Sequence, residues 1–265
     1  MTEKRKITRI VIAFVSAIVT LFVTGILARY VTPLIAKTPG QISVLNQAYA
    51  AVFSVIVCIA LGYKKVFKFN FSEYLARCKK DKKNCISLII GAFIVIAFAI
   101  YLTSDAIALP GSEVIYIVIM MLLIGICEEA FFRGALLNTL LDYYGKDDEK
   151  KIFKALIVSA VMFGLFHLAN INSFLAIFLC IAQCIINIPA GYILGGTYLR
   201  TRSIWPCALM HASVDLFLFV AQGMLEGKTE MQMMVTSISV DVCFVILITS
   251  LCLLILRKKK LTEVA

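Results

Sequence analysis

The chain has 265 residues, 61% of them hydrophobic, and a mean hydropathy of +0.94. A soluble domain holds only about 45–50% apolar residues, so this composition excludes an ordinary soluble protein and indicates one that crosses a membrane several times. The net charge of +10 would suggest nucleic acid binding in a soluble protein. Here the basic residues lie in short loops and at the ends, where they set membrane topology, so we expect no nucleic acid partner.

Long apolar runs predict helical spans, because a transmembrane helix needs about 20 predominantly apolar residues. We expect an all-α membrane protein, a bundle of eight transmembrane helices that forms a single domain over residues 1–265. No soluble domain and no internal repeat is evident. In chain order, the predicted spans are 8–28, 43–63, 86–103, 114–138, 153–170, 173–199, 204–223 and 232–256.

The first span follows the basic start MTEKRKITR and resembles a signal peptide, but its apolar run is long and lacks a small-x-small cleavage site. We therefore expect a retained signal anchor. Lys and Arg are alternately frequent and rare along the chain: four lie in the first nine residues, eight in 64–85, none in 104–113 and three in 139–152. This alternation predicts that both termini are cytoplasmic.

The longest predicted loop, 64–85, combines its lysines with Phe67, Phe69, Phe71 and Tyr74. A basic segment with this many aromatic residues is typical of one that lies on an anionic membrane surface. The alternative is an ordinary basic loop on the cytoplasmic side. The sequence leaves both interpretations open.

The nine cysteines give no disulfide framework. Most of them lie in apolar segments, where cysteine behaves as a small hydrophobic residue. No CxxC pair is present, and the two cysteines that flank the basic loop are predicted to face the reducing cytosol.

Three charged residues, Glu128, Glu129 and Arg133, interrupt the predicted span 114–138. Each charge at the centre of a span costs about 2.5–3.5 kcal/mol on insertion scales, so a functional reason is expected. Glu129 and Arg133 are four residues apart and share a helix face, which predicts an ion pair. Glu128 points away from that helix face and is left free for a catalytic role. The alternative is a charge cluster that only fixes helix packing.

The two histidines of the chain, His167 and His211, both lie in predicted spans. Asp215 follows His211 by four residues, and Phe163 precedes His167 by four, so each pair shares a helix face. At about 1.5 Å per residue, Glu128, His211 and His167 lie about 15, 10 and 21 Å from the cytoplasmic ends of their helices. These depths permit one cluster.

Two other interruptions of the apolar spans give less information about function. Asn187 and Pro189 predict a kink, with neighbouring small residues that allow close helix packing. Asp241 is a further carboxylate within a predicted span, and we assign it no role.

Two glutamates, two histidines and an aspartate suggest hydrolysis by an activated water, with a carboxylate as general base and imidazole donors for the oxyanion. We expect no metal and no other cofactor. His and Glu are good zinc ligands, so bound zinc remains the alternative, although the HExxH signature is absent. Cys127 is a weaker candidate nucleophile, because adjacent helix positions point about 100° apart.

Three motifs in this order resemble those of a known family. They are EEAFFR at 128–133, FGLFH at 163–167 and HASVD at 211–215. The pattern is similar to that of the CPBP family, which includes the CAAX prenyl proteases and bacteriocin-processing or abortive-infection membrane proteins. The motifs fall within a core of roughly 114–223, and the other predicted helices match only in hydropathy.

The resemblance implies a membrane-embedded glutamic endopeptidase that opens to the cytosol. Carried over by position, Glu128 and His167 would activate the water, and His211 and Asp215 would form the oxyanion site. Glu129, Arg133 and Phe163 would support these residues.

The prenyl protease branch usually has Asn at the position of Asp215, so the resemblance favours a bacterial member in a prokaryotic cell membrane. The implied substrate is a membrane-associated peptide, either a prenylated protein or a short bacterial peptide, and membrane lipids are the other expected partner. A non-catalytic scaffold or bacteriocin-immunity protein of the same fold is the alternative. A proton-coupled transporter has less support, because no inverted repeat is present.

Overall fold

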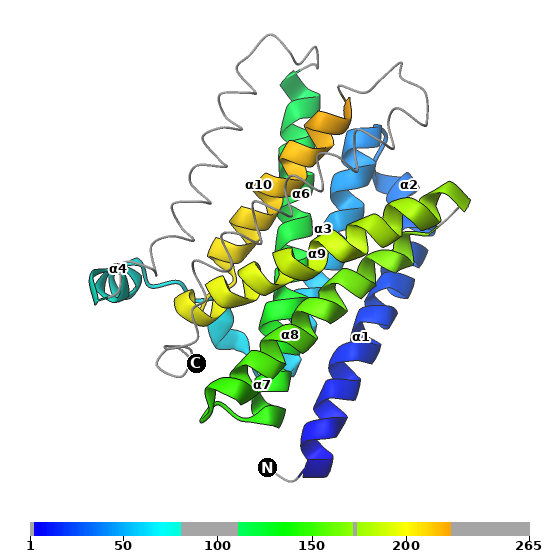
Figure 1. Cartoon of the computed structure of the whole chain (residues 1–265). Coiled ribbons are helices and arrows are strands. Elements are labelled where there is room, and N and C mark those ends of the chain that lie inside the picture. The colour runs from blue at the N-terminus through cyan, green and yellow to red at the C-terminus, as the bar shows by residue number, and fades with distance from the viewer. Residues whose placement is uncertain (1–2, 81–110, 172–173, 224–265) are drawn as a thin grey trace.

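The computed structural model describes residues 3–80, 111–171 and 174–223. These residues are helical almost throughout and contain no strand, which confirms the predicted all-α membrane fold (Figure 1). In chain order the helices are α1 (Glu3–Tyr30), α2 (Thr32–Ile35), α3 (Pro39–Ala60), the 3₁₀ turn η1 (Lys64–Phe67), α4 (Phe71–Lys80), α6 (Gly111–Glu129), the π-helix η2 (Ala130–Leu137), α7 (Asn138–Tyr144), α8 (Glu149–Phe166), the 3₁₀ turn η3 (His167–Asn170), α9 (Phe174–Thr201) and α10 (Trp205–Gly223).

Five helical stretches among the described residues are long and apolar enough to cross a membrane, which fits an integral membrane protein. They correspond to the predicted spans 8–28, 43–63, 114–138, 153–170 and 173–199, and α10 coincides with the predicted span 204–223. The predicted spans 86–103 and 232–256, with Asp241, lie outside the described residues. The number of eight spans therefore stays a prediction.

Several predicted boundaries were wrong by a few residues, as at the starts of α1 and α3 and at the end of the span 114–138. The span expected to end at 138 continues to Tyr144, because α6, η2 and α7 form one uninterrupted helical stretch. It ends at Gly145, whose φ of +106° is a conformation that favours glycine. The next helix, α8, starts at a cap in which the Asp148 side chain accepts from the Lys150 backbone N–H at 3.0 Å.

The core of the bundle surrounds η2. Every residue from Glu129 to Leu141 is buried, whereas α1 exposes Phe22 and many other apolar side chains, as a helix that faces lipid does. η2 contacts α1, α3, α8 and α9. The centre of this helical stretch is thus packed on all sides, and the charged residues of the first motif lie at its start.

Small residues bring the neighbouring helices close at this level. A Cβ on Gly125 of α6 would lie 2.5 Å from the carbonyl oxygen of Ala208 in α10, and one on Gly191 of α9 would lie 3.0 Å from the Phe163 ring. Only glycine allows these approaches. The small residues expected around Pro189, which lies inside α9, therefore serve close packing as predicted.

Candidate active site

The first motif lies where an α-helix becomes a π-helix. Glu128 and Glu129 end α6, and η2 follows directly, with Arg133 in its first half. π-helical turns inside α-helices are rare and are frequent at functional sites. The wider turn still places Arg133 Nη1 2.7 Å from Glu129 Oε1, so the predicted ion pair is confirmed.

Glu129 connects two helices. Its Oε1 atom accepts from Arg133 and also lies 2.9 Å from Nδ1 of His211, a residue of α10. Arg133 in turn donates from Nη2 to the Gly191 carbonyl of α9 at 3.1 Å, and its guanidinium lies 4.5 Å from the centre of the Phe163 ring. One carboxylate and one guanidinium thus join η2 to α8, α9 and α10.

His211 has a defined orientation. Because a carboxylate only accepts, Nδ1 of His211 donates to Glu129, and Nε2 is the nitrogen that points to the rest of the site. Nε2 lies 3.5 Å from Asp215 Oδ2 and 3.7 Å from Glu128 Oε2. Three carboxylates therefore surround one imidazole.

His167 lies at the end of α8, where it caps the helix and begins η3. Its Nδ1 atom is 3.0 Å from the Phe163 carbonyl oxygen. A carbonyl oxygen only accepts, so Nδ1 carries the proton and the lone pair of a neutral His167 lies on Nε2. This is the tautomer that a general base needs.

Phe163 contacts both histidines. Its ring centre lies 5.3 Å from that of His167 and 5.6 Å from that of His211, in edge-to-face geometry each time. Its predicted packing on His167 is therefore confirmed.

The structure brings all the candidate residues together from three separate parts of the chain. We call them the site cluster: Glu128, Glu129, Arg133, Phe163, His167, His211 and Asp215.

Several polar atoms of the site cluster have no hydrogen-bond partner. They are the Oε2 atoms of Glu128 and Glu129 and the Nε atom of Arg133. Buried polar atoms are normally paired, and an exception calls for an explanation such as a catalytic role. Glu129 is fully buried, whereas the Glu128 side chain is 25% exposed. Glu128 is therefore the carboxylate that a substrate or a water molecule can reach.

Two further possibilities from the sequence can be placed. The thiol of Cys127 lies 3.2 Å from the Ser54 hydroxyl of α3, so its hydrogen bond is made outside the site cluster. In the described ranges, no group of three or more His, Cys, Asp or Glu side chains is arranged to hold a metal ion.

Sequence reasoning missed two parts of the site. One is the Gly191 carbonyl, which a sequence cannot mark as an acceptor for Arg133. The other is the π-helix, since the argument from helix faces assumed α-helical geometry throughout. The charges at 128, 129 and 133 were the available signal that this stretch is unusual.

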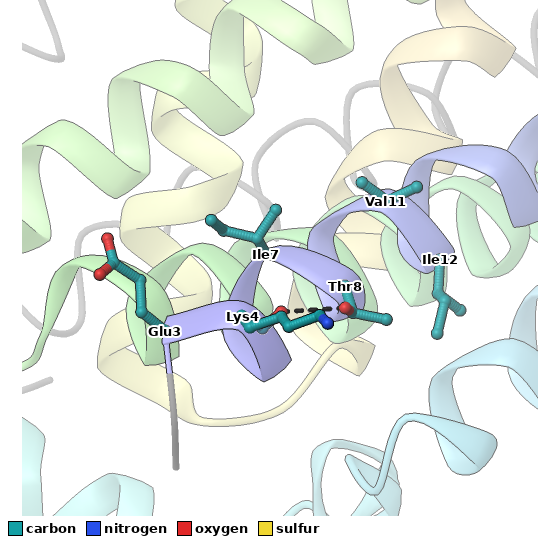
Figure 2. Close-up of a pocket in the computed structure, with 6 residues that line it drawn as sticks. All are labelled: Glu3, Lys4, Ile7, Thr8, Val11 and Ile12. Carbon is teal, nitrogen blue, oxygen red and sulfur yellow. Dashed lines mark hydrogen bonds between the residues drawn. The ribbon is translucent and has the colours of Figure 1, made fainter.

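A hollow on the outer face of α1 does not belong to this site. It is lined by Glu3, Lys4, Ile7, Thr8, Val11 and Ile12, which follow one another along the first turns of a single helix (Figure 2). None of these residues belongs to the three motifs.

The fold and the site cluster define a helical integral membrane protein with acidic and histidine side chains gathered between its spans. Residues 110–217, from the start of α6 to α10, match the family model described as type II CAAX prenyl endopeptidase Rce1-like. This confirms the family resemblance that the three motifs indicate. No curated protein matches the chain.

Proposed function

We propose that the chain is a membrane-embedded endopeptidase that uses a water activated by Glu128 and His167. The observation that carries the proposal is that the two adjacent glutamates differ in burial and in their partners. Glu129 is fully buried and bound to Arg133 and His211, whereas the Glu128 side chain is 25% exposed and lies 3.7 Å from His211 Nε2, too far for a hydrogen bond. The family match over 110–217, to a family of membrane endopeptidases, supports the same conclusion.

In the proposed reaction, Glu128 takes a proton from water, and the oxygen of that water attacks the carbonyl carbon of the scissile peptide bond. Nε2 of His167 holds the same water, because its Nδ1 proton is committed to the Phe163 carbonyl. The C–N bond then breaks, and the proton taken from water is returned to the leaving amine. Acid–base groups of this kind contribute about 10²–10⁴-fold to a rate.

The negative charge that develops on the carbonyl oxygen is assigned to His211. Its Nδ1 is held by Glu129 at 2.9 Å, so Nε2 is directed to the reacting group. Doubly protonated His211 donates from Nε2 to this oxygen, and Asp215, 3.5 Å from Nε2, stabilises the charged ring. Glu129, Arg133 and Phe163 hold the imidazole in position.

We propose a substrate that is itself held in or at the membrane, either a prenylated protein or a short bacterial peptide, and a reaction without a metal. The distribution of Lys and Arg supports a topology with both termini cytoplasmic. Asp in place of Asn at 215 supports a prokaryotic cell membrane. The single-domain organisation, with the catalytic core in 114–223, belongs to the same proposal.

The test compares four strains: wild type, a deletion, Glu128→Gln, and Glu3→Gln as a matched control at an exposed glutamate of α1. Both variants must reach the wild-type level in the membrane. Mass spectrometry of membrane and secreted peptides is expected to show the same uncleaved precursor in the deletion and in Glu128→Gln, but not in Glu3→Gln. If Glu128→Gln matches wild type while the deletion differs, the protein acts as a non-catalytic scaffold or immunity protein.

A further inference from the structure

The first residues of the segment that contains η1 and α4 are fixed to the bundle by hydrogen bonds. The Ile204 backbone N–H donates to the Val66 carbonyl at 3.0 Å, and the Trp205 indole N–H donates to the Phe67 carbonyl at 2.8 Å. Val66 is buried. η1 therefore has a set position beside the start of α10, and α4 extends from it.

The helix α4 carries apolar side chains on an exposed strip. Phe71 is 54% exposed and Leu75, one turn later, is 42% exposed. Phe69 lies next to them, with its ring centre 6.3 Å from that of Phe71 and 5.8 Å from that of the buried Tyr74. Large apolar groups gathered on a surface mark a contact with a membrane or another protein.

The same segment is strongly basic. Between residues 64 and 80, Glu73 is the single acidic residue. Exposed lysines precede the apolar strip in the sequence. Lys79, two turns after Phe71, lies on the same face of α4. Amphipathic helices bind anionic lipid in this way: their aromatic and other apolar side chains enter the membrane, and lysine ammonium groups lie beside them. The exposed lysines of this segment are Lys64, Lys65, Lys68 and Lys79.

The direction of α4 suits a membrane surface. In Figure 1, α4 is seen nearly end-on while α1, α6 and α10 are seen lengthwise, so its axis lies across theirs. Trp205, 39% exposed at the start of α10, is a residue that prefers the membrane–water boundary. A similar boundary is visible on α1, where Glu3 and Lys4 give way to Ile7 and Val11 (Figure 2).

We propose that η1 and α4, residues 64–80, form an interfacial element that binds anionic lipid headgroups. Phe69, Phe71 and Leu75 enter the boundary between headgroups and acyl chains, and Lys64, Lys65, Lys68 and Lys79 contact the phosphates. This resolves the two interpretations of the basic loop in favour of the membrane surface. The element contributes no residue to the site cluster, so this inference stands apart from the proposed function.

The single tryptophan of the chain makes the test specific. A Trp205→Phe background removes the indole bond to Phe67 but keeps the backbone hydrogen bond from Ile204 to Val66 that also fixes η1. In this background, Phe71→Trp places a fluorescent probe on the apolar strip, and Glu73→Trp places the matched control about 200° around the same helix. Each full-length variant is reconstituted into vesicles that contain lipids brominated on their acyl chains. Leu75→Trp is the second probe if Phe71→Trp elutes as an aggregate in size exclusion.

We expect brominated lipid to quench Trp at 71, most strongly with bromine near the headgroup end of the chain, and acrylamide to quench Trp at 73. Brominated phosphatidylglycerol should quench Trp at 71 more than brominated phosphatidylcholine does, and high salt should remove this preference. Exchange of the four lysines for glutamine should lower the preference by about tenfold or more.

Three outcomes would overturn all or part of the inference. Quenching of Trp at 71 by acrylamide and not by bromine would place the strip in water. Protection of the same probe from both quenchers would mean that protein covers it. Quenching by bromine with no preference for the anionic lipid would overturn the assignment of the lysines to phosphate.

Discussion

Among the described residues, two of the polar clusters that tie the helices together differ in how fully their hydrogen bonds are made. The first is the site cluster around Glu129 and His211. The second, which we call the end clamp, lies where α3 and α7 end and consists of Arg9, Tyr63, Asp142 and Lys146. Each cluster contains a carboxylate, an arginine and an aromatic ring.

Both carboxylate oxygens of the end clamp have partners. Asp142 Oδ2 accepts from the Tyr63 hydroxyl at 2.7 Å and lies 3.5 Å from Arg9 Nη1, while Oδ1 lies 3.0 Å from Lys146 Nζ. Arg9 also donates to the Leu61 carbonyl and lies 4.9 Å from the centre of the Tyr63 ring. With its hydrogen bonds made and the side chains of Arg9 and Asp142 each 24% exposed, this cluster is suited to holding α1, α3 and α7 together.

The site cluster is more deeply buried and less complete. Glu128 and Glu129 each keep an oxygen without a partner, although an unmade hydrogen bond in a buried place costs about 1–3 kcal/mol, and more for a charged group. A purely structural cluster would gain by closing these bonds, as the end clamp does. The comparison therefore separates polar groups that hold the fold from polar groups kept available for a substrate.

The largest effect is expected for catalysis. His167→Ala should lower kcat by about 10²–10⁴-fold because it removes a group that holds the water. The melting temperature should change little, since His167 is half-buried and bonds to a carbonyl of its own helix. The measurement is steady-state cleavage of the precursor by purified protein. Asp142→Asn in the end clamp should leave kcat unchanged. An equal loss of kcat in both variants would refute the distinction between the site cluster and the end clamp.

The next effect is on stability. Arg133→Met leaves the buried charge of Glu129 with His211 as its remaining partner, and loss of one member of a buried pair costs up to about 3–5 kcal/mol. Asp142→Asn breaks a quarter-exposed pair and should cost about 1 kcal/mol or less. Thermal unfolding in detergent compares the two. Addition of Glu129→Gln to Arg133→Met should restore part of the loss, and strict additivity of the two changes would argue against the pair.

A smaller effect on stability is expected when Tyr63 of the end clamp is changed. Burial raises the pKa of the Tyr63 hydroxyl, which therefore stays protonated at neutral pH and donates to Asp142. Tyr63→Phe removes this hydrogen bond and the longer one, at 3.3 Å, between the Tyr63 and Thr139 hydroxyls, and should cost about 1–2 kcal/mol. The melting temperature should fall slightly with full activity. A loss of activity at wild-type stability would mean that the end clamp serves the reaction.

The smallest effect concerns Asp147 and Lys151, a pair that lies in water at the α7–α8 turn. The hydrogen bond from Lys151, at 2.9 Å, lowers the pKa of Asp147 below its ordinary value of 3.8. The stabilisation is therefore present above the ordinary pKa and is lost as the pH falls through the lowered value. Because the pair is fully exposed, Asp147→Asn should leave the melting temperature unchanged within error at neutral pH. A clear drop there would show that exposed pairs also hold the bundle.

Helix periodicity predicted the local part of the site. Glu129 with Arg133, Phe163 with His167, and the last motif's histidine with its aspartate are all pairs at a spacing of four, and each pair is in contact in the structure. The hydropathy pattern also predicted the spans that the described residues contain. These features follow from one helix at a time.

The bonds between helices could not be predicted in the same way. Glu129 binds His211, which lies 82 residues further along the chain, and Arg133 binds a carbonyl of α9. The resemblance groups His211 with Asp215, and only the structure shows that His211 Nδ1 also lies 2.9 Å from Glu129. These partners depend on how close two helices pack, and small residues such as Gly125 decide that distance.

The π-helix also limits how the length of this stretch can vary. A π-turn contains one residue more than the α-turn it replaces, so loss of a single residue within 130–137 would allow an ordinary α-helix to form. The flanking parts of the helix would then keep their faces, because the π-turn and the α-turn that replaces it complete the same rotation. A deletion in the α-helical parts on either side would instead rotate one side by about 100° relative to the other. We therefore expect sequence alignments of related chains to place any single-residue gap of this stretch within 130–137 and not in α6 or α7.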